Sequence, residues 1–472
     1  MDEQTSQKPV NPRRKKRSQM QIFKETYLPV IIAGVSLVMI LIFIIGAISR
    51  GIQNGQAAKE ASIQASESEA EAYAQLEDEA NRLIAGSQTF AAGYDYDRAI
   101  AVIDTFSGDI SQFPKLTELK QQYTEAKSSL VAWSDPSQVT NLSFMPLIVD
   151  TDRAFADAVY GEYYNRRYVT IEEFQKILEQ LYANNYVLVG MDDIVTGGGS
   201  GSYSAGTVYL PEGKKPIMIT QMNVSYPYQL VDGNNDLRAD KDGDGFASKL
   251  VFDENGELAC EYVDDEGQTL VGAYDLVPIL NAFVKEHPDF SYKGAKAILA
   301  VSGYNGVLGY RIQADAEKTS GTALFEQEKT AVKDLAEALR SEGYDLACYT
   351  YEDIGYGEKD VSTVKADLAS WTEEIAPVLG DVSIFVYAQS SDIADQDSDY
   401  SGDKYTALQS AGFRIFVSNA SDGKSWISLK DSYVRQGRVL VSGSTMAYNS
   451  DWFTGMFDAK SVLDTNRGNV PQ

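Results

Sequence analysis

Apolar residues from residue 140 onward follow two alternating patterns. Short runs rich in β-branched and aromatic residues have the length of buried strands, and longer segments repeat apolar residues at helical spacing. Strands alternating with helices predict parallel βα units, and about seven such units predict an α/β fold closed into a (β/α) barrel. The predicted strands lie in 142–150, 186–195, 214–227, 295–304, 344–350, 381–388 and 412–419, and the helices in 170–185, 276–288, 324–342 and 361–379.

One of these helices has a clear start signal. Thr170 stands directly before the apolar periodicity, and Glu173 follows three positions later. This arrangement predicts a capping box, in which each side chain accepts a hydrogen bond from the other residue's backbone N–H.

The N-terminal segment has a different pattern. Leu28 to Ile48 is a run of 21 residues without a charge, long enough to cross a bilayer as a helix. Five consecutive basic residues at 13–17 precede it, which predicts a cytoplasmic N-terminus. The sequence therefore predicts a basic tail at 1–27, an uncleaved anchor at 28–49, and a single-pass protein of the cell membrane whose C-terminal part is extracytoplasmic.

Residues 50–134 are predicted to form a helical stalk. An Ala- and Glu-rich helix at 57–86 is followed by two amphipathic segments at 92–106 and 113–133, which suggest a helical hairpin. A dimeric coiled coil stays an alternative for the first helix, although its apolar seam is poor. Turn-forming residues at 134–138 separate the stalk from a domain at 140–472.

Charge excludes one class of partner. The formal net charge is −27, while residues 1–24 alone carry seven basic and two acidic residues. The rest of the chain is therefore strongly acidic, and a nucleic-acid partner is not expected. The two cysteines, Cys260 and Cys348, have no diagnostic spacing, so they are either two separate buried thiols or a disulfide that an extracytoplasmic compartment would permit.

An acidic loop is a candidate calcium site. Asp240, Asp242 and Asp244 alternate before Gly245, as in the first half of a calcium-binding loop. Val251 stands where such a loop ends in glutamate, so an acidic loop exposed to solvent is the alternative interpretation.

Several long segments carry a family resemblance. The runs "LIVDTDRAF", "VTIEEFQKILEQLYANNYVLV", "GFASKLVFDENGEL", "GAYDLVPILNAFVKEHPDFSYKGAKAIL", "GYNGVLGYR" and "SYVRQGRVL" extend over most of residues 140–472. They resemble the polysaccharide deacetylase family in the membrane-anchored form of Gram-positive bacteria. The resemblance implies a distorted (β/α) barrel that removes acetyl groups from cell-wall glycans with a divalent metal.

The positions that carry the family's chemistry differ in this chain. The family's adjacent pair of aspartates, a base and a metal ligand, corresponds to Met222 and Asn223 in "ITQMNVS". Its two metal-binding histidines correspond to Tyr349 and Asp353 in "CYTYEDIG". Methionine cannot take a proton, and a neutral amide is a weak ligand, so the resemblance implies that the ancestral metal site and catalysis are lost.

Further family positions are also changed. Ala388 and Ser390 replace a proline and a glycine, and Met145 replaces a histidine. The only histidine, His287, stands at a predicted helix end before Pro288. Glu352, Asp353 and Asp392 could still support an unusual site for a hard cation.

Tyrosines offer a possible sugar-binding surface, because sugars stack on aromatic faces. The candidates near predicted strand ends are Tyr226, Tyr228, Tyr304, Tyr310, Tyr349, Tyr351 and Tyr387. The alternative is that they are core and rim residues of a large barrel.

Three hypotheses follow for the function. The first is a pseudoenzyme at the cell surface that binds cell-wall glycan or acts as a scaffold. The second is an envelope protein that binds a protein partner without a glycan role, and the third is a residual metal-dependent deacetylase. Under the first two, no cofactor is expected apart from possible calcium.

Overall fold

A computed structural model describes residues 39, 55–198, 202–233 and 238–472. The chain divides into two compact units, and the boundary along the chain falls between Ser129 and Leu130. Apart from Met39, the predicted anchor Leu28–Ile48 lies outside the described residues. Within the described ranges, no helix is both long enough and apolar enough to cross a membrane.

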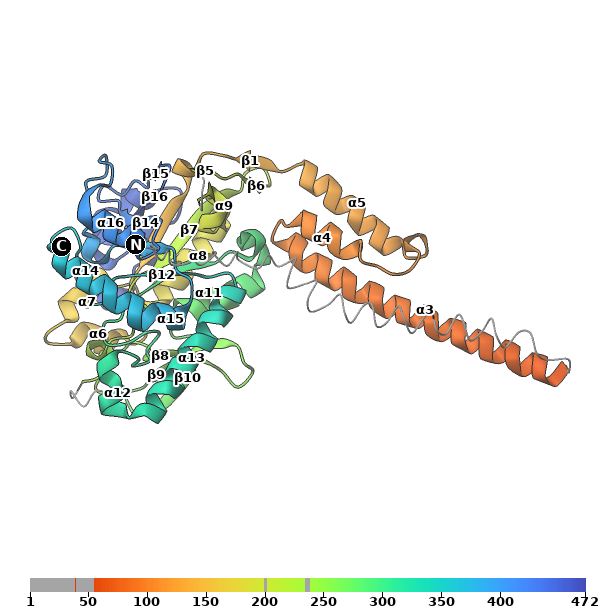
Figure 1. Ribbon diagram of the computed structural model, residues 1–472, viewed down its shortest axis with the longest axis horizontal. Helices are drawn as coiled ribbons and strands as arrows, with labels where there is room; N and C mark the ends of the chain where they lie inside the picture. The colour runs from red at the N-terminus through yellow and green to blue at the C-terminus, as the bar shows by residue number, and fades with distance from the viewer. Residues whose placement is uncertain (1–38, 40–54, 199–201, 234–237) are drawn as a thin grey trace, which may run out of the picture. The chain divides into compact units, whose positions relative to one another are not determined.

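In the described part of the first unit, from Gly55 onward, three α-helices share a small core. These are α3 (Gly55–Ala92), α4 (Tyr96–Ile103) and α5 (Pro114–Ser128), shown in Figure 1. The two predicted hairpin helices pack on each other and also on α3, whose C-terminal half contributes Ala80 and Leu83 to the core. The helix predicted at 113–133 ends earlier than expected, because Val131–Trp133 is the strand β1.

The second unit is built around a closed barrel of seven parallel strands, as the barrel prediction expects. The strand predicted at 186–195 lies outside this ring, whereas Val434–Leu440, a ring strand, was not predicted. Each strand pairs with the next around the ring, and the last pairs with the first. In ring order the strands are β2 (Thr140–Phe144), β7 (Lys215–Gln221), β11 (Ala297–Val301), β12 (Asp345–Cys348), β13 (Ile384–Val386), β14 (Ile415–Asn419) and β16 (Val434–Leu440).

The barrel has a seam at β7. One edge of β7 pairs with β2, and the other edge is shared by two strands. There β3 (Tyr186–Leu188) pairs with Lys215–Ile217, and β11 pairs with Ile219–Gln221. Only the second half of β7 therefore closes the ring.

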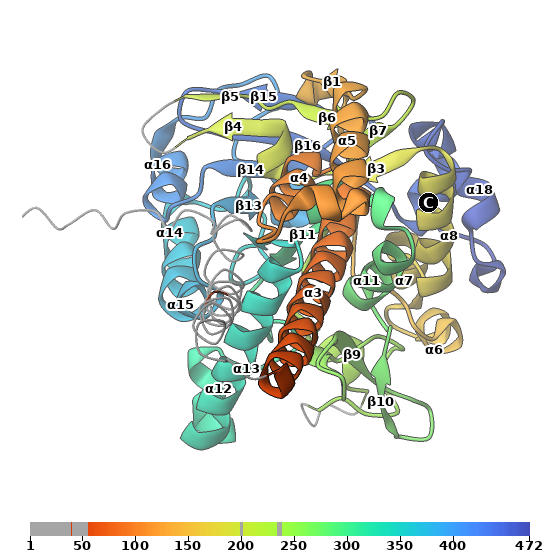
Figure 2. The same ribbon diagram turned by 90° about the vertical axis from the view of Figure 1, so that its right-hand side faces the viewer.

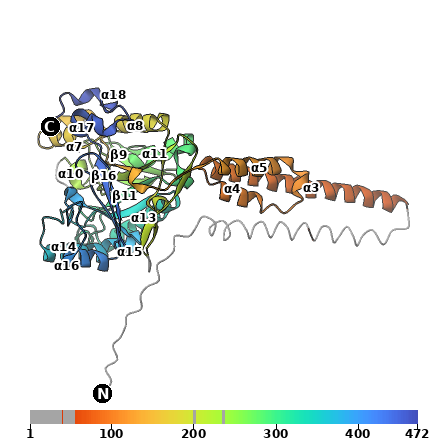
Figure 3. The same ribbon diagram turned by 90° about the horizontal axis from the view of Figure 1, so that it is seen from above.

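Helices surround the barrel on its outside (Figures 2 and 3). The capping box predicted for Thr170 and Glu173 is confirmed at the start of the first long helix. The principal helices are α8 (Ile171–Ala183), α11 (Leu276–Glu286), α13 (Thr322–Ser341), α14 (Val361–Ser370), α15 (Ala376–Leu379), α16 (Gly402–Ser410), α17 (Gly443–Tyr448) and α18 (Ala459–Val462). The remaining named helices are α6 (Thr151–Ala156), α7 (Gly161–Arg167), α9 (Met191–Ile194), α10 (Tyr228–Val231) and α12 (Ala314–Ser320).

Small antiparallel sheets lie outside the ring. The strand predicted at 186–195 is wrong in its second half, because β3 ends at Leu188 and the Gly190 N–H donates to the Asp193 carboxylate at the start of α9. The strand β6 (Val208–Leu210) pairs with β1, and β4 (Val195–Gly197) pairs with β5 (Tyr203–Ala205). A three-stranded sheet contains β8 (Lys249–Phe252), β9 (Leu258–Val263) and β10 (Thr269–Gly272). The last additional strand, β15 (Ile427–Leu429), pairs with β16.

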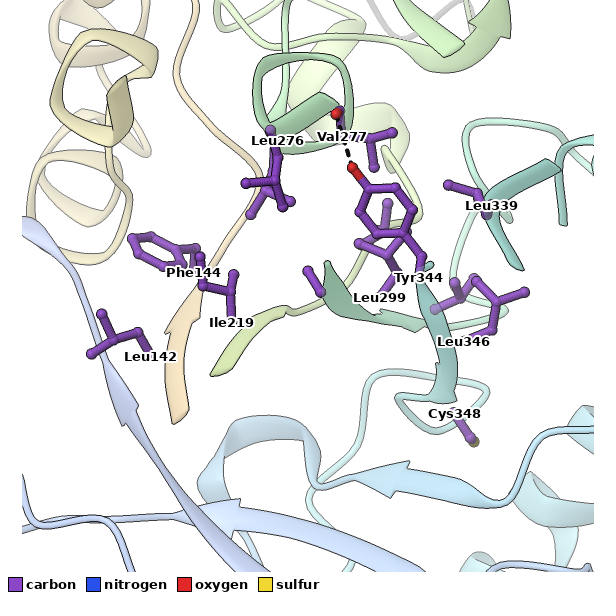
Figure 4. Packing of buried hydrophobic residues seen from close by; sticks show 14 of the residues in the cluster. Leu142, Phe144, Ile219, Leu276, Val277, Leu299, Leu339, Tyr344, Leu346 and Cys348 are labelled. Atoms are coloured by element: carbon purple, nitrogen blue, oxygen red, sulfur yellow. Dashed lines mark hydrogen bonds between the residues drawn. The ribbon is translucent and has the colours of Figure 1, made fainter. Parts of the chain in front are cut away.

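The core lies between the barrel strands and the helices that cover them. Figure 4 shows Leu299 and Leu346 near Tyr344, whose hydroxyl donates to the Val277 carbonyl at 3.0 Å. Burying each aliphatic side chain contributes about 1.5–3 kcal/mol. Cys260 in β9 and Cys348 in β12 are buried free thiols, so the structure favours the unpaired alternative.

The last residues of the chain are held against α7 and α8 by an ion pair with both side chains buried. The Arg467 guanidinium binds the Glu173 carboxylate through Nε at 2.5 Å and Nη2 at 2.6 Å. It also donates to the carbonyls of Asn165 and Tyr168, at the C-terminal end of α7. The capping glutamate predicted from local sequence therefore has a second, long-range role.

Candidate functional site

The carboxyl ends of β7, β11 and β12 meet at one mouth of the barrel, because the strands are parallel neighbours. Backbone hydrogen bonds continue one residue past the strands, from Met222 N to Phe144 O and from Tyr349 N to Val301 O, both at 2.8 Å. Asn223 follows Met222 directly. The segments that carry the four changed family positions are thus placed at the same edge.

Asn223 and Asp353 contact each other. The Asn223 Nδ2 donates to Asp353 Oδ2 at 3.3 Å, and Asn223 Oδ1 accepts from Ser302 Oγ at 2.9 Å. The Ser302 hydroxyl also lies 2.9 Å from Ser225 Oγ. The two ends of the amide therefore have different partners, and Asn223 is held as a donor toward Asp353.

The loops at this mouth have unusual backbone conformations. Asn223 and Asp353 have φ of 53° and 52°, in the left-handed region that asparagine and aspartate tolerate better than most residues. Thr350, Gln389 and Ser390 share this region, with φ of 66°, 53° and 55°. Such backbone persists only where surrounding contacts hold it, and it is concentrated at binding and catalytic sites.

Arg438 is buried beside Met222. It comes from β16, is 2% exposed, and its Nε donates to Met222 Sδ at 3.0 Å. Its other donors bind the carbonyls of Val417 at 3.2 Å and Tyr387 at 3.0 Å. Burial lowers the pKa of this guanidinium from its ordinary value. Among the described residues, no carboxylate forms an ion pair with it.

Tyr349 interacts electrostatically with both Asp353 and Arg438. Burial raises the pKa of the Tyr349 hydroxyl, the charge of Asp353 raises it further, and Arg438 opposes the shift. The backbone of Gln389 also opposes the rise in the pKa of this hydroxyl. Burial, and then the charge of Asp367, raises the pKa of Asp353 to about 7.

These residues do not fit the divalent metal that the resemblance implies. The donor set is one carboxylate, one amide, one thioether and a tyrosine that stays protonated, whereas a zinc site takes three strong protein ligands. The positive charge of Arg438 next to Met222 also disfavours a cation there. In the part of the chain that the structure describes, no group of three His, Cys, Asp or Glu side chains could hold a metal ion.

The other candidate positions have structural partners or face solvent. Asp392 forms an ion pair with Arg435 at 2.8 Å, whereas Glu352 is exposed. Met145 is buried, and Ala388 begins the turn that presents Gln389. His287 follows the end of α11, as predicted, and its ring lies 4.3 Å from that of Tyr182.

The predicted sugar-binding tyrosines do not form one surface. Tyr226 and Tyr387 are fully buried and Tyr349 and Tyr351 nearly so, which leaves these four rings without an accessible face in this structure. The remaining three are partly exposed: the Arg311 guanidinium covers Tyr228 at 4.0 Å, the Tyr310 hydroxyl donates to Leu250 O at 3.0 Å, and Tyr304 lies beyond β11.

The acidic loop is held by local hydrogen bonds. Asp240 Oδ1 accepts from the N–H groups of Asp242 at 2.9 Å and Gly233 at 3.2 Å, and Asp244 accepts from the Tyr164 hydroxyl. These bonds occupy oxygens of two of the three carboxylates. Calcium binding by this loop stays a prediction.

The sequence reasoning missed two contributors to the mouth. The first is Arg438, which lies in the run "SYVRQGRVL" and was not predicted to have a role in the site. The second is α7 with the residue that follows it, Tyr168. Burial raises the pKa of the Tyr168 hydroxyl, and electrostatic interactions with Tyr163, Asp353 and Tyr349 raise it further. Four tyrosines within "YGEYYNRRY" were a compositional signal for this aromatic cluster.

Comparisons with known proteins place the chain only loosely. No protein-family model matches the sequence, and a search of curated proteins gave no match. Among solved structures, the Streptococcus pyogenes deacetylase PplD in complex with acetate aligns with 65% of this chain and 93% of its own chain, at 11% identity and a TM-score of 0.33.

Proposed function

We propose that residues 140–472 are a deacetylase-like barrel without catalysis that binds glycan at the cell envelope. The N-terminal helix would anchor this pseudoenzyme to the membrane. The sequence runs that resemble the polysaccharide deacetylase family support the ancestry. The changed residues at the mouth support the loss of chemistry.

The observation that carries the proposal is the contact between Arg438 and Met222. A guanidinium donates to the thioether at the position where the family has its base, 3.0 Å from sulfur. A thioether takes up no proton at neutral pH, so residue 222 cannot activate water. The fixed positive charge also makes a neighbouring divalent cation unfavourable by several kcal/mol at an effective dielectric constant of about 20.

A residual deacetylase is the second candidate. One observation favours it, since the pKa of Asp353 is raised to about 7, a value suited to a general base. Against it, the Asp353 carboxylate faces the donor of Asn223, and no strong metal ligand of the expected set accompanies it.

Metal content and acetate release test the loss of catalysis. The purified chain should contain no stoichiometric zinc, cobalt or nickel, and should release no acetate from chitooligosaccharide or peptidoglycan. The combined changes Met222→Asp, Asn223→Asp, Tyr349→His and Asp353→His should restore metal binding, and Arg438→Gln added to them should increase the affinity. Metal-dependent acetate release by the wild-type chain that is lost on Asp353→Ala would overturn the proposal.

Sedimentation with insoluble peptidoglycan tests the glycan role. The wild-type chain should sediment with it and should be displaced by soluble cell-wall fragments. A chain that stays in the supernatant at all concentrations would favour an envelope protein that binds a protein partner.

A further inference from the structure

Two exposed tyrosines lie at the start of the short helix α7. Tyr160 and Tyr163 are 44% and 41% exposed, and they flank the start of α7. Each ring packs against a buried tyrosine. The centroid of Tyr160 lies 5.8 Å from that of Tyr164, and the centroid of Tyr163 lies 5.8 Å from that of Tyr168. Tyrosine rings that pack against neighbouring rings and still remain partly exposed suit stacking on a ligand ring. We call Tyr160, Tyr163 and the neighbouring Arg167 the α7 rim.

The rim is rigid because α7 is fixed at its end. Arg467 donates to the carbonyls of Asn165 and Tyr168 at 2.6 and 2.7 Å, and Asn165 Nδ2 binds the Arg467 carbonyl in return. A binding surface that is already ordered loses little conformational entropy when a ligand arrives.

Arg167 and, at the mouth, Arg438 both lack a carboxylate partner among the described residues. Arg167 stands four residues after Tyr163, so their side chains lie on the same face of α7, and Arg167 is half-buried. No ion pair joins either guanidinium to a carboxylate within the described ranges. Two carboxylates of the mouth region are already engaged, since Asp392 is paired with Arg435 and Asp353 accepts a hydrogen bond from Asn223. The Arg167 guanidinium is partly removed from water and has no counter-ion among the described residues, so an anion that reached it would be stabilised.

We propose that the α7 rim binds a sugar that carries a carboxylate, with a pyranose ring stacked on Tyr163 and the carboxylate held by Arg167. This inference rests on the proposed glycan role and narrows it to acidic glycans. Guanidinium and carboxylate form paired, charge-assisted hydrogen bonds, which gives the site both affinity and orientation. The net charge of −27 repels an anionic glycan at long range, so the local contacts must supply the attraction.

Titration calorimetry with two probes of matched length tests the proposal. The full chain is titrated with an oligogalacturonate hexamer and with chitohexaose, near physiological ionic strength. The acidic hexamer should bind about tenfold more tightly or better. Arg167→Gln should weaken it at least about tenfold, as expected for a hydrogen bond to a charged group, and should abolish the preference. Tyr163→Ala should weaken both probes about fivefold, because stacking does not depend on charge.

Matched controls come from the same helix and from a distant strand. Arg166 is the exposed neighbour of Arg167, so Arg166→Gln changes the net charge equally and should leave binding unchanged. Tyr209 in β6 is 47% exposed, and Tyr209→Ala should likewise have no effect. Circular dichroism of each variant establishes that the fold is intact.

The outcomes separate the two proposals. Equal affinity for the two hexamers with no response to Arg167→Gln would overturn the acidic-sugar site while leaving glycan binding in place. Equal loss from Arg166→Gln and Arg167→Gln would show non-specific charge attraction and also overturn the site. If neither hexamer nor peptidoglycan binds, both proposals are wrong.

Discussion

Removal of the Arg467 guanidinium should destabilise the barrel unit strongly. In Arg467→Met the carboxylate of Glu173 stays buried without its cation, although the N–H groups of Thr170 and Asp464 still donate to it at 2.9 and 2.8 Å. Breaking a buried ion pair on one side costs about 3–5 kcal/mol. For a domain of this size, roughly 2 °C of melting temperature is lost per kcal/mol, so we expect a decrease of roughly 6–10 °C.

Urea unfolding followed by circular dichroism measures this free energy. Arg166→Met, on the exposed side of α7, serves as the matched control and should stay within about 0.5 kcal/mol of the wild type. Adding Glu173→Gln to Arg467→Met should recover part of the loss, because a neutral amide needs no counter-ion. If Arg467→Met lies within about 1 kcal/mol of the wild type, or if the two losses simply add, the ion pair does not have the role assigned to it.

Three further predictions concern pH, calcium and topology. The pKa of Asp353 is raised from 3.8 to about 7, so the folded chain holds this proton where the unfolded chain has lost it. Stability should therefore fall as pH rises from about 4 to 7, by at most about 1.4 kcal/mol per pH unit, and urea midpoints of Asp353→Asn should lack this part of the slope. Millimolar calcium should raise the melting temperature, and Asp242→Ala should abolish the rise; a curve indifferent to calcium excludes all but very weak binding. Protease added to intact cells should degrade residues 140–472, and their survival while a known surface protein is cleaved would contradict the predicted orientation.

Local sequence signals predicted the parts of the fold that depend on neighbouring residues. The Thr170–Glu173 capping box and six of the seven ring strands follow from periodicity and spacing and appear in the structure, whereas the ring strand β16 was missed and the predicted strand β3 lies outside the ring. The sheet β8–β9–β10 was missed, since its short strands lie among loop-forming residues and their pairing depends on contacts beyond the local pattern.

The mouth of the barrel was predictable only in part. The family resemblance pointed to Asn223 and Asp353, which do contact each other. Arg438 could not be foreseen, because its approach to Met222 depends on where β16 lies in the ring, and a basic residue in a strand is usually a surface residue. The burial of Tyr226 and Tyr387 was also hidden, since a tyrosine after a strand has the same sequence pattern whether it faces solvent or core.

The seam at β7 gives the polar mouth a mechanical role. Only Ile219–Gln221 pairs with β11, so this junction is shorter than the one between β7 and β2. Just beyond it, Val224 N bonds Ala300 O at 2.9 Å, and the side chains of Asn223 and Ser225 both bond the Ser302 hydroxyl. The bonds that fix Asn223 toward Asp353 thus also join the two segments that follow the seam. Hydrogen exchange at these amides therefore reports directly on local opening of the barrel, and a ligand bound at the mouth should slow that exchange before it changes the global stability.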